Sequence, residues 1–547
     1  MKTCVLSRML VFGLIVASPG ARSAPEPFFD GLGSHTHQVT TRSADAQKYF
    51  DQGLNFYFGF NHSAAIRSFK EAARLDPACA MAHWGIALAN GPHINFPMVP
   101  PPNAAEAWVE LTLAQQHAAA ASPFEQALIT ALAKRYANPQ PDDRSPLDQA
   151  YAAAMREVWK KFPRDPDAGV LFAEAMMDLR PWDQWTPEGQ PQPGTDEIIA
   201  TLDAVLKLDI NHPFANHLYI HALEASPHPE RALAAADRLR DLQPALAHNV
   251  HMPSHIDIRV GHWQEAIVAN EKAVAAQQRA RGASGPPHGM LAIYNAHNHQ
   301  MLTWAAMMTG QGDLALSHIR TMVAEFPEDT LKEFAMVAEG MSAMPLEVLV
   351  RFGRWDEVLA APDFPDWQPL SRAMRLGARG IAFAAKGDPK LARAEQAAFL
   401  AAAKKVPAGE MFLNNTAAAV LAVQTSMVDG EILYREGKVD AGLAQFRAAV
   451  KAEDALHYDE PPGWILPVRH SLGAVLMQER RFAEAEQVYR DDLSRLPENG
   501  WSLFGLSESL RYQHKNDEAA SLDARFKKIW AKADIPLHSS CLCQPGV

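Results

Sequence analysis

Apolar residues recur every three or four positions along most of this chain, in segments of helical length that are separated by short polar turns. This spacing places the apolar side chains on one face of an α-helix. Runs in which apolar and polar residues alternate strictly, as in half-buried strands, are almost missing from the sequence. The pattern therefore predicts an all-α fold built from amphipathic helices that pack against their neighbours.

The segment at residues 46–79 shows how one pair of helices is encoded. Two antiparallel helices approach closely only where small residues meet large ones, and a proline ends the second helix. The segment meets these demands at Tyr49, Gly53, Phe56, Ala65, Phe69, Ala72 and Pro77. Similar segments follow at residues 213–246, 247–280, 298–331, 423–456, 466–499 and 500–533.

This arrangement resembles the tetratricopeptide repeat family. The resemblance implies a right-handed superhelix (an α-solenoid) of about nine repeats with proline-rich insertions, over residues 46–533. We expect residues 24–547 to form one solenoid, with an N-terminal arm at 24–45 and a C-terminal tail at 534–547. One insertion, at residues 180–194, carries Trp182 and Trp185 and is expected to fold over the solenoid.

The first 23 residues are typical of a secretory signal peptide. Lys2 and Arg8 accompany a short apolar run that ends at Ala17, and small residues follow it. We therefore expect a periplasmic or secreted protein, with no membrane span after cleavage. The stretches HLYIHALEAS, HMPSHIDIRVG, EPPGWILPVR and LPENGWSLFGL are similar to a group of exported bacterial tetratricopeptide proteins without an assigned activity.

Composition narrows the class of partner. The chain has 547 residues, of which 48% are hydrophobic and 21% charged, enough for a large folded core. Its net charge of −12 argues against nucleic acid as the partner. Cys79, Cys541 and Cys543 lie beyond the signal peptide. The two thiols of the tail are expected to be oxidised, to pair with Cys79, or to bind a soft metal ion.

Two histidine pairs carry the most specific chemical signal. His217 and His221 in HLYIH have the same internal spacing as His251 and His255 in HMPSH. The pairs lie 34 residues apart, which is one tetratricopeptide period. Equivalent positions of consecutive repeats are neighbours in a solenoid, so the two pairs are predicted to face one another.

Further residues extend this row of histidines. By the family resemblance, the row lines the concave groove and includes His248, His297 and His299, with Glu224 and Arg259 beside it. Glu224 would orient an imidazole ring. Proline disrupts a helix interior but suits a first turn, so Pro253 predicts that a helix begins near Met252 and leaves His251 in a loop.

Imidazoles from adjacent helices can converge on one transition-metal ion. Neutral imidazole suits zinc, copper, nickel or iron, whereas a site poor in carboxylates disfavours calcium and magnesium. We therefore favour copper or zinc as the cofactor. Nearby methionines would suit copper if they faced the groove, namely Met252, Met290, Met301, Met307 and Met308.

Other histidines are weaker candidates. His35 and His37 in the N-terminal arm could fold back to supply a ligand, and His83 and His93 flank a loop, where ligands are common. His470 follows the insertion LHYDEPPGWILPVR, which forms either a second wall of the groove or a stiff linker. We assign the following to the surface or to packing: His62, His262, His318, His514 and His538.

The leading hypothesis is a transition-metal site in the groove, used for metal-dependent chemistry on a small molecule or for metal handling. HLYIH lacks the glutamate of the HEXXH motif, so metalloprotease chemistry is not indicated. Acid/base chemistry or anion binding by protonated histidines is an alternative, with Arg259 pairing with a carboxylate. A further alternative is a protein-interaction scaffold whose groove binds a peptide or a partner helix without metal.

Overall fold

The computed structural model describes residues 26–284 and 287–544, and consecutive helices pack against one another throughout these ranges. The N-terminal half contains α1 (Ala44–Phe58), α2 (His62–Leu75), α3 (Ala80–Ala89), α4 (Pro101–His117), η1 (Ala118–Ala120), α5 (Pro123–Leu132), α6 (Ser145–Lys161), α7 (Pro166–Met177), α8 (Thr195–Leu208), α9 (Pro213–Leu223), η2 (Pro229–Ala232), α10 (Leu233–Leu242), α11 (Ala247–His251) and α12 (Pro253–Val260).

The C-terminal half is also helical apart from one short antiparallel hairpin. It contains α13 (Trp263–Ser284), α14 (Met290–Met308), α15 (Gly312–Glu325), α16 (Glu328–Glu333), α17 (Ala335–Ala338), η3 (Glu339–Ala343), α18 (Met344–Arg351), α19 (Trp355–Ala360), α20 (Pro369–Ala385), α21 (Pro389–Ala403), β1 (Met411–Phe412), β2 (Asn415–Thr416), α22 (Ala417–Arg435), α23 (Val439–Asp454), α24 (Val468–Gln478), α25 (Phe482–Arg495), α26 (Gly500–Tyr512), α27 (Asn516–Ile529) and η4 (Trp530–Lys532).

The small-to-large rule read from the sequence holds the first repeats together. The ring of Phe69 on α2 lies against Gly53 of α1 and Gly85 of α3. A Cβ atom at either glycine would come within 2.6–2.7 Å of that ring, too close for any side chain. These glycines therefore let three consecutive helices pack around one aromatic residue.

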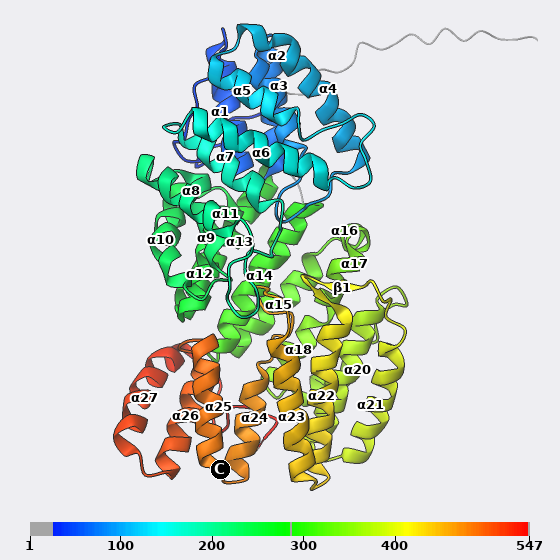
Figure 1. The fold of residues 1–547 in the computed structure, drawn as a ribbon. Coiled ribbons are helices and arrows are strands. Elements are labelled where there is room, and N and C mark those ends of the chain that lie inside the picture. Colours follow the sequence, from blue (N-terminus) through cyan, green and yellow to red (C-terminus); the bar gives the residue numbers. More distant parts are fainter. Residues whose placement is uncertain (1–25, 285–286, 545–547) are drawn as a thin grey trace, which may run out of the picture.

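The buried apolar residues form two clusters that meet at α12 and α14. The first cluster ends at Ile256 on α12 and takes in Tyr294 of α14, whereas the second begins at Ile258 and takes in Ala296. Figure 1 shows the N-terminal helices above the C-terminal ones, with α13, α14 and α15 between them. α12 and α14, which carry His255 and His297, thus lie where the two clusters join.

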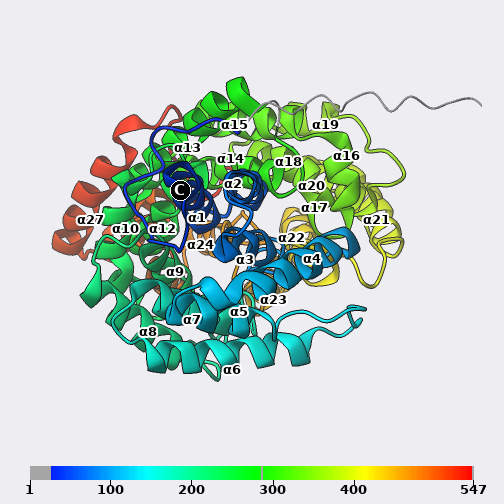
Figure 2. The ribbon, with the colours of Figure 1, turned by 90° about the horizontal axis from the view of Figure 1, so that it is seen from above.

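The chain curls back on itself, so that the last repeats contact the middle of the sequence (Figure 2). Trp263 at the start of α13 donates its indole N–H to the carbonyl of Pro497, at 2.8 Å. Trp501 of α26 donates in the same way to the carbonyl of Met307 on α14, at 2.7 Å. These bonds join segments that are far apart in sequence and fix the position of α14 beside the histidine-bearing helices.

The predicted all-α fold of tetratricopeptide-like helix pairs is confirmed. The predicted signal peptide lies outside the described residues. Within them, no helix is both long and apolar enough to cross a membrane. Cys541 and Cys543 form a disulfide with each other, and Cys79 is buried with a free thiol. The tail is packed in place, since Cys543 is buried and Gln544 donates to Glu431 on α22, at 2.9 Å.

Candidate metal centre

Pro253 divides the second histidine segment into two short helices. α11 ends at His251, and Pro253 occupies the first turn of α12, where its missing N–H is not needed. The expectation that a helix begins near Met252 is therefore confirmed, whereas the expectation that His251 lies in a loop is wrong. His251 closes a helix, is fully buried, and brings its Nε2 atom within 2.7 Å of the Nε2 atom of His255.

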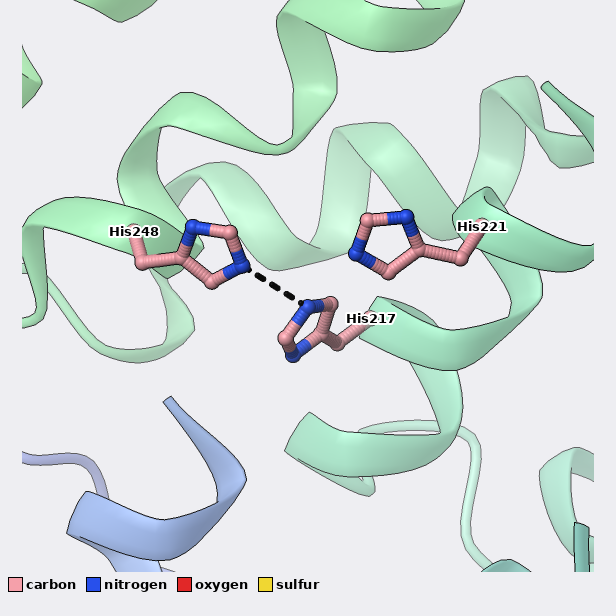
Figure 3. A group of neighbouring side chains, drawn as sticks. All are labelled: His217, His221 and His248. Carbon is pink, nitrogen blue, oxygen red and sulfur yellow. Dashed lines mark hydrogen bonds between the residues drawn. The ribbon is translucent and has the colours of Figure 1, made fainter. Parts of the chain in front are cut away.

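The first histidine group consists of His217, His221 and His248, each of which offers a ring nitrogen within 4.8 Å of the others. His217 and His221 project from α9 and His248 from α11, and the three rings face a common point (Figure 3). The Nε2 atoms of His217 and His248 are 3.1 Å apart. Two nitrogens bound to one tetrahedral ion are separated by about 3.3 Å, because each bond is about 2.0–2.1 Å long.

Hydrogen bonds at the far side of two rings fix the position of the protons. Nδ1 of His217 donates to the carbonyl of Phe58 at 2.9 Å, and Nδ1 of His221 donates to Oε1 of Glu224 at 2.9 Å. In the neutral rings both Nε2 atoms therefore carry lone pairs. The Nε2 atom of His221 has no hydrogen-bond partner among the described residues.

The third ring of this group cannot satisfy both of these nitrogens. Neutral His248 can place its single proton on Nε2 and donate to His217. That choice leaves its Nδ1 atom buried, with no partner in the described part of the chain, and leaves Nε2 of His221 unpaired. Buried polar atoms without partners are costly, and a metal ion would satisfy three lone pairs at once.

The second histidine group consists of His251, His255 and His297, whose ligand atoms also lie within 4.8 Å of one another. Nδ1 of His251 donates to Oδ1 of Asn270 at 2.7 Å, so Nε2 of His251 carries a lone pair directed at His255. The Nε2 atom of His297, on α14, is 3.5 Å from that of His255. The three side chains of this group thus come from the short helices α11 and α12 and from α14.

Two carboxylates contact the histidine groups: Glu224 contacts both groups, and Glu460 contacts the second. Oε1 of Glu224 accepts from His221, while Oε2 of Glu224 lies 2.7 Å from Nδ1 of His255. Glu460 approaches the same Nδ1 atom at 2.5 Å. The ring centroids of His221 and His255 are 5.7 Å apart, so the two groups are immediate neighbours. Carboxylates behind imidazoles orient the rings and raise the basicity of the opposite nitrogen.

Burial keeps most of these rings neutral. Desolvation lowers the pKa of His217, His248 and His251, and neighbouring histidines lower it further. The pKa of His297 falls to about 3, mainly by burial. His255 is the exception: burial alone would lower its pKa, but Glu460 and Glu224 outweigh burial and raise it to about 10. Neutral imidazoles are the form that binds a metal ion.

Aromatic residues from distant segments close the site. Phe60, after α1, lies 4.5 Å from His217 between ring centroids, and Tyr294 of α14 lies 4.7 Å from His248. Trp182 of the insertion at 180–194 packs edge-on against His221 at 5.4 Å, so this insertion does fold over the helices. The histidines are therefore enclosed in the protein rather than displayed along an exposed groove.

His299 does not join either group. Its Nδ1 atom lies 3.0 Å from Nδ1 of His318 on α15, which places it on the opposite side of α14 from the second group. Arg259 lies near Glu224 and Glu460, and its guanidinium stacks 5.3 Å from the ring centre of Tyr458. Of the seven histidines predicted as ligands, the structure brings together His217, His221, His248, His251, His255 and His297.

His83 and His470 are held by hydrogen bonds at both ring nitrogens. His83 contacts Glu110 at 2.6 Å and the carbonyl of Pro77 at 3.2 Å. His470 accepts from Arg351 at 2.8 Å and donates to Asp492 at 2.9 Å. Rings satisfied on both sides have no nitrogen left for a metal ion.

The arm histidines form a separate cluster around Asp167 on α7. His35 and His37 fold back to contact its two carboxylate oxygens at 3.1 and 2.6 Å, and His212 contacts it at 3.0 Å. Nδ1 of His212 accepts from the backbone of Ala215, so His212 donates its one proton to Asp167. This cluster ties the arm to the start of α9.

His93 stacks on His62 with ring centroids 4.2 Å apart, beside the first histidine group. His62, which the sequence assigned to the surface or to packing, is therefore one of the buried rings next to the site. Burial lowers the pKa of His62 to about 4. Each of the two rings has a buried nitrogen without a partner in the described part of the protein, Nε2 in His62 and Nδ1 in His93.

Several residues around the site carried no signal in the sequence. Asn270 has the spacing of an ordinary helical residue, and Phe60 and Tyr294 read as core aromatics. Glu460 belongs to the insertion LHYDEPPGWILPVR, for which the sequence predicts either a second wall of the groove or a stiff linker. Its position next to proline in a segment rich in aromatic residues was the one indication that it belongs to a site.

No family model matches the chain, and no curated protein matches it. Solved structures that are similar include a human IFIT1 dimer with PPP-AAAA, at 12% identity over 88% of this chain and 89% of that one, with a TM-score of 0.34. A Rap protein complexed with Competence and Sporulation Factor has 12% identity over 75% of this chain and 99% of its own, at 0.34. Yeast Tom70 has 10% identity over 90% and 92%, at 0.27. Such values do not bear on function.

Proposed function

We propose that this protein binds transition-metal ions in its interior, through the two histidine groups, and uses them for chemistry on a small molecule or for metal handling. The observation that carries the proposal is the orientation of His217 and His221. Both rings donate through Nδ1 to fixed acceptors and direct Nε2 lone pairs toward a third imidazole. Such lone pairs have no use in a packed core, but they suit a cation.

The ligand set favours copper or zinc. The first group offers three imidazole nitrogens, and the second offers three once metal binding displaces the proton of His255. The carboxylate of Glu224 lies behind two of the rings rather than among the Nε2 atoms. Three protein ligands leave a coordination position open, which is the arrangement of catalytic rather than structural sites. Calcium and magnesium would require oxygen ligands instead.

Elemental analysis tests this proposal on full-length protein purified without a histidine tag and reloaded separately with copper and with zinc. The variant His217→Ala/His221→Ala/His255→Ala removes ligands from both groups and is expected to lose most of the bound metal. The matched control His228→Ala/His288→Ala/His514→Ala removes three exposed histidines and is expected to keep it.

Circular dichroism of the three proteins separates loss of ligands from loss of fold. A conservative second variant, His221→Gln alone, keeps the volume and polarity of the site and is expected to weaken metal binding in a folded protein. If the wild-type protein holds no more metal than the triple variant, the proposal is wrong. A protein-binding scaffold without metal would then be the function to test.

A further inference from the structure

A solvent-connected cavity of about 370 Å³ lies beside the histidine groups. Its walls come from the insertion at 180–194, the C-terminal end of α12 and the insertion at 456–470. Pro187, Glu188 and His457 at its edge are exposed, so the cavity opens to the surface. A cavity of this volume is suited to a small organic molecule.

Aromatic side chains dominate the apolar part of the cavity. Trp182 and Trp185 come from one insertion, Tyr458 and Trp464 from the other, and Trp304 from α14. Five aromatic rings from three separate segments form flat apolar surfaces that favour a planar ring in the ligand. The chemistry of the walls therefore selects for an aromatic or otherwise flat molecule.

Arg259 provides an uncommitted positive charge in the same cavity. Arg469 and Arg495 also line it, but both pair with Asp454, at 2.7 and 3.4 Å. Arg259 is bonded only weakly, through Nη2 to the carbonyl of Ser226 at 3.3 Å, and its buried Nε has no partner within the described ranges. Glu224 and Glu460 are near Arg259, but no carboxylate in the described part of the chain lies within ion-pair distance of it, so its unpaired N–H groups can bind an anion.

Other donors around the cavity also lack partners. The indole nitrogens of Trp304 and Trp464 and the hydroxyl of Tyr458 are buried and have no hydrogen-bond partner among residues 26–284 and 287–544. Seven acidic residues also line the cavity, but burial raises the pKa of Glu453 to about 8 and that of Asp459 well above its usual range. Four others are paired, Asp183 with Arg180, Asp454 with Arg469, Asp492 with His470 and Glu460 with His255, and Glu188 is exposed at the edge. The local excess of donors favours a ligand with acceptor oxygens.

A smaller cavity continues from this one toward the histidines. It measures about 20 Å³, shares Trp182 and Tyr458 with the larger cavity, and is lined by His221 and Glu224. This volume is enough for roughly one water molecule. Trp182 and Tyr458 thus stand between the larger cavity and the first histidine group.

We propose that the larger cavity binds a small aromatic carboxylic acid, with its carboxylate on Arg259 and its ring against Trp182 and Tyr458. Binding follows from the cavity alone. The use of this acid as a substrate rests on the proposed metal-binding function, since Trp182 and Tyr458 would place it one side chain away from His221. The occupant is thereby defined by its chemistry: one negative charge and one flat apolar ring.

Isothermal titration of the full-length protein with three probes of nearly equal shape tests the charge requirement. Indole-3-acetate carries the carboxylate, indole-3-acetamide is its neutral counterpart, and tryptamine is cationic. We expect indole-3-acetate to bind about ten- to a hundredfold more tightly than the amide, and tryptamine more weakly still. Equal affinities, or no saturable binding of the acid up to about 1 mM, would overturn the inference.

Substitutions locate the binding. Arg259→Gln is expected to reduce the affinity for indole-3-acetate to that of the amide, whereas Arg495→Gln, in the same wall but paired with Asp454, should leave it unchanged. Tyr458→Phe removes only a hydroxyl and is expected to weaken binding in a protein that folds normally. Unchanged affinity in both Arg259→Gln and Tyr458→Phe contradicts the assignment.

Titrations of metal-loaded and metal-free protein keep the two proposals apart. Acid binding through Arg259 in a protein that takes up no metal supports the cavity and refutes the metal centre. Metal uptake without acid binding does the reverse. Weaker binding of indole-3-acetate by Trp182→Phe in the same titration is the expected signature of a ring lying against Trp182.

Discussion

His217 and His470 occupy the same position in the repeats predicted at 213–246 and 466–499 and are both fully buried, yet their surroundings differ. His470 accepts from Arg351 and donates to Asp492, so each ring nitrogen has a partner. Nδ1 of His217 donates to the carbonyl of Phe58, whereas Nε2 faces the Nε2 atom of His248, which is itself a candidate metal ligand. The repeat sets burial, whereas the facing helices decide whether a histidine is structural or available to a metal ion.

We expect the largest change in the free energy of unfolding when Asp492, the hydrogen-bond partner of His470, is removed. Asp492 is buried and accepts from His470, Asn499 and Ser502. Asp492→Ala leaves these donors unpaired and should lower the free energy of unfolding by about 3–5 kcal/mol, as when one partner of a buried ion pair is removed. Urea denaturation followed by circular dichroism measures the change.

The metal content of this variant tests whether His470 is separate from the metal-binding histidines. Asp492→Ala should bind as much metal per folded molecule as the wild type, because His470 belongs to neither histidine group. The isosteric Asp492→Asn can place its amide oxygen where Oδ2 of Asp492 accepts all three hydrogen bonds, so it should lose less stability. Loss of metal in a folded Asp492→Asn protein would contradict the assignment of His470 as a structural histidine outside the metal site.

Metal loading should stabilise the folded protein through His217 and the other members of the two histidine groups. A ligand that binds only the folded state, present at a hundredfold excess over its dissociation constant, adds about 2.7 kcal/mol to the free energy of unfolding. We expect a rise in Tm on adding copper or zinc, reversed by a chelator. The same addition to His217→Ala/His221→Ala/His255→Ala should leave Tm unchanged, and an equal rise there would contradict the site.

Glu224 tests the link between the two groups. Its carboxylate accepts from His221 and lies against His255, and burial alone would raise its pKa, but these two histidines lower it to about 2. Glu224→Gln should weaken metal affinity about 10- to 100-fold, roughly 1.4–2.7 kcal/mol, as for residues that orient ligands. Competition with a chelator of known affinity gives the value. Glu230→Gln, an exposed pair with His228, is the control.

Much of the fold and part of the site follow from the sequence for physical reasons. The 34-residue spacing fixed which histidines become neighbours, because helices one repeat apart must pack side by side. Pro253 correctly predicted the start of a helix, but His251 was misplaced because a second short helix, α11, ends directly before it. The local effect of a proline depends on how the preceding helix ends, and that is decided by tertiary packing.

The remaining members of the site depend on contacts that periodicity does not encode. Glu460 reaches His255 from an insertion two hundred residues along the chain, and Tyr294 reaches His248 from the helix that follows another insertion. His299 faces His318 because it lies two residues after His297 on α14, which places the two side chains on nearly opposite sides of that helix.

We expect the smallest change in the free energy of unfolding in the N-terminal arm, where His37 contacts the carboxylate of Asp167. Burial alone would lower the pKa of His37, but its hydrogen bond and attraction to Asp167, with Asp165 and Glu125 nearby, raise it. The charged pair therefore stabilises the fold fully below pH 6.5, and this contribution is lost as the pH rises through the raised value. His37→Gln should lower the free energy of unfolding by about 1 kcal/mol near pH 5.5 and much less near pH 9.

Urea midpoints of wild type and variant at the two pH values measure this difference, and metal content should be the same in both proteins. An equal loss of stability at both pH values would mean that the His37 contact with Asp167 does not depend on charge, and a loss of metal would place the arm cluster among the ligands.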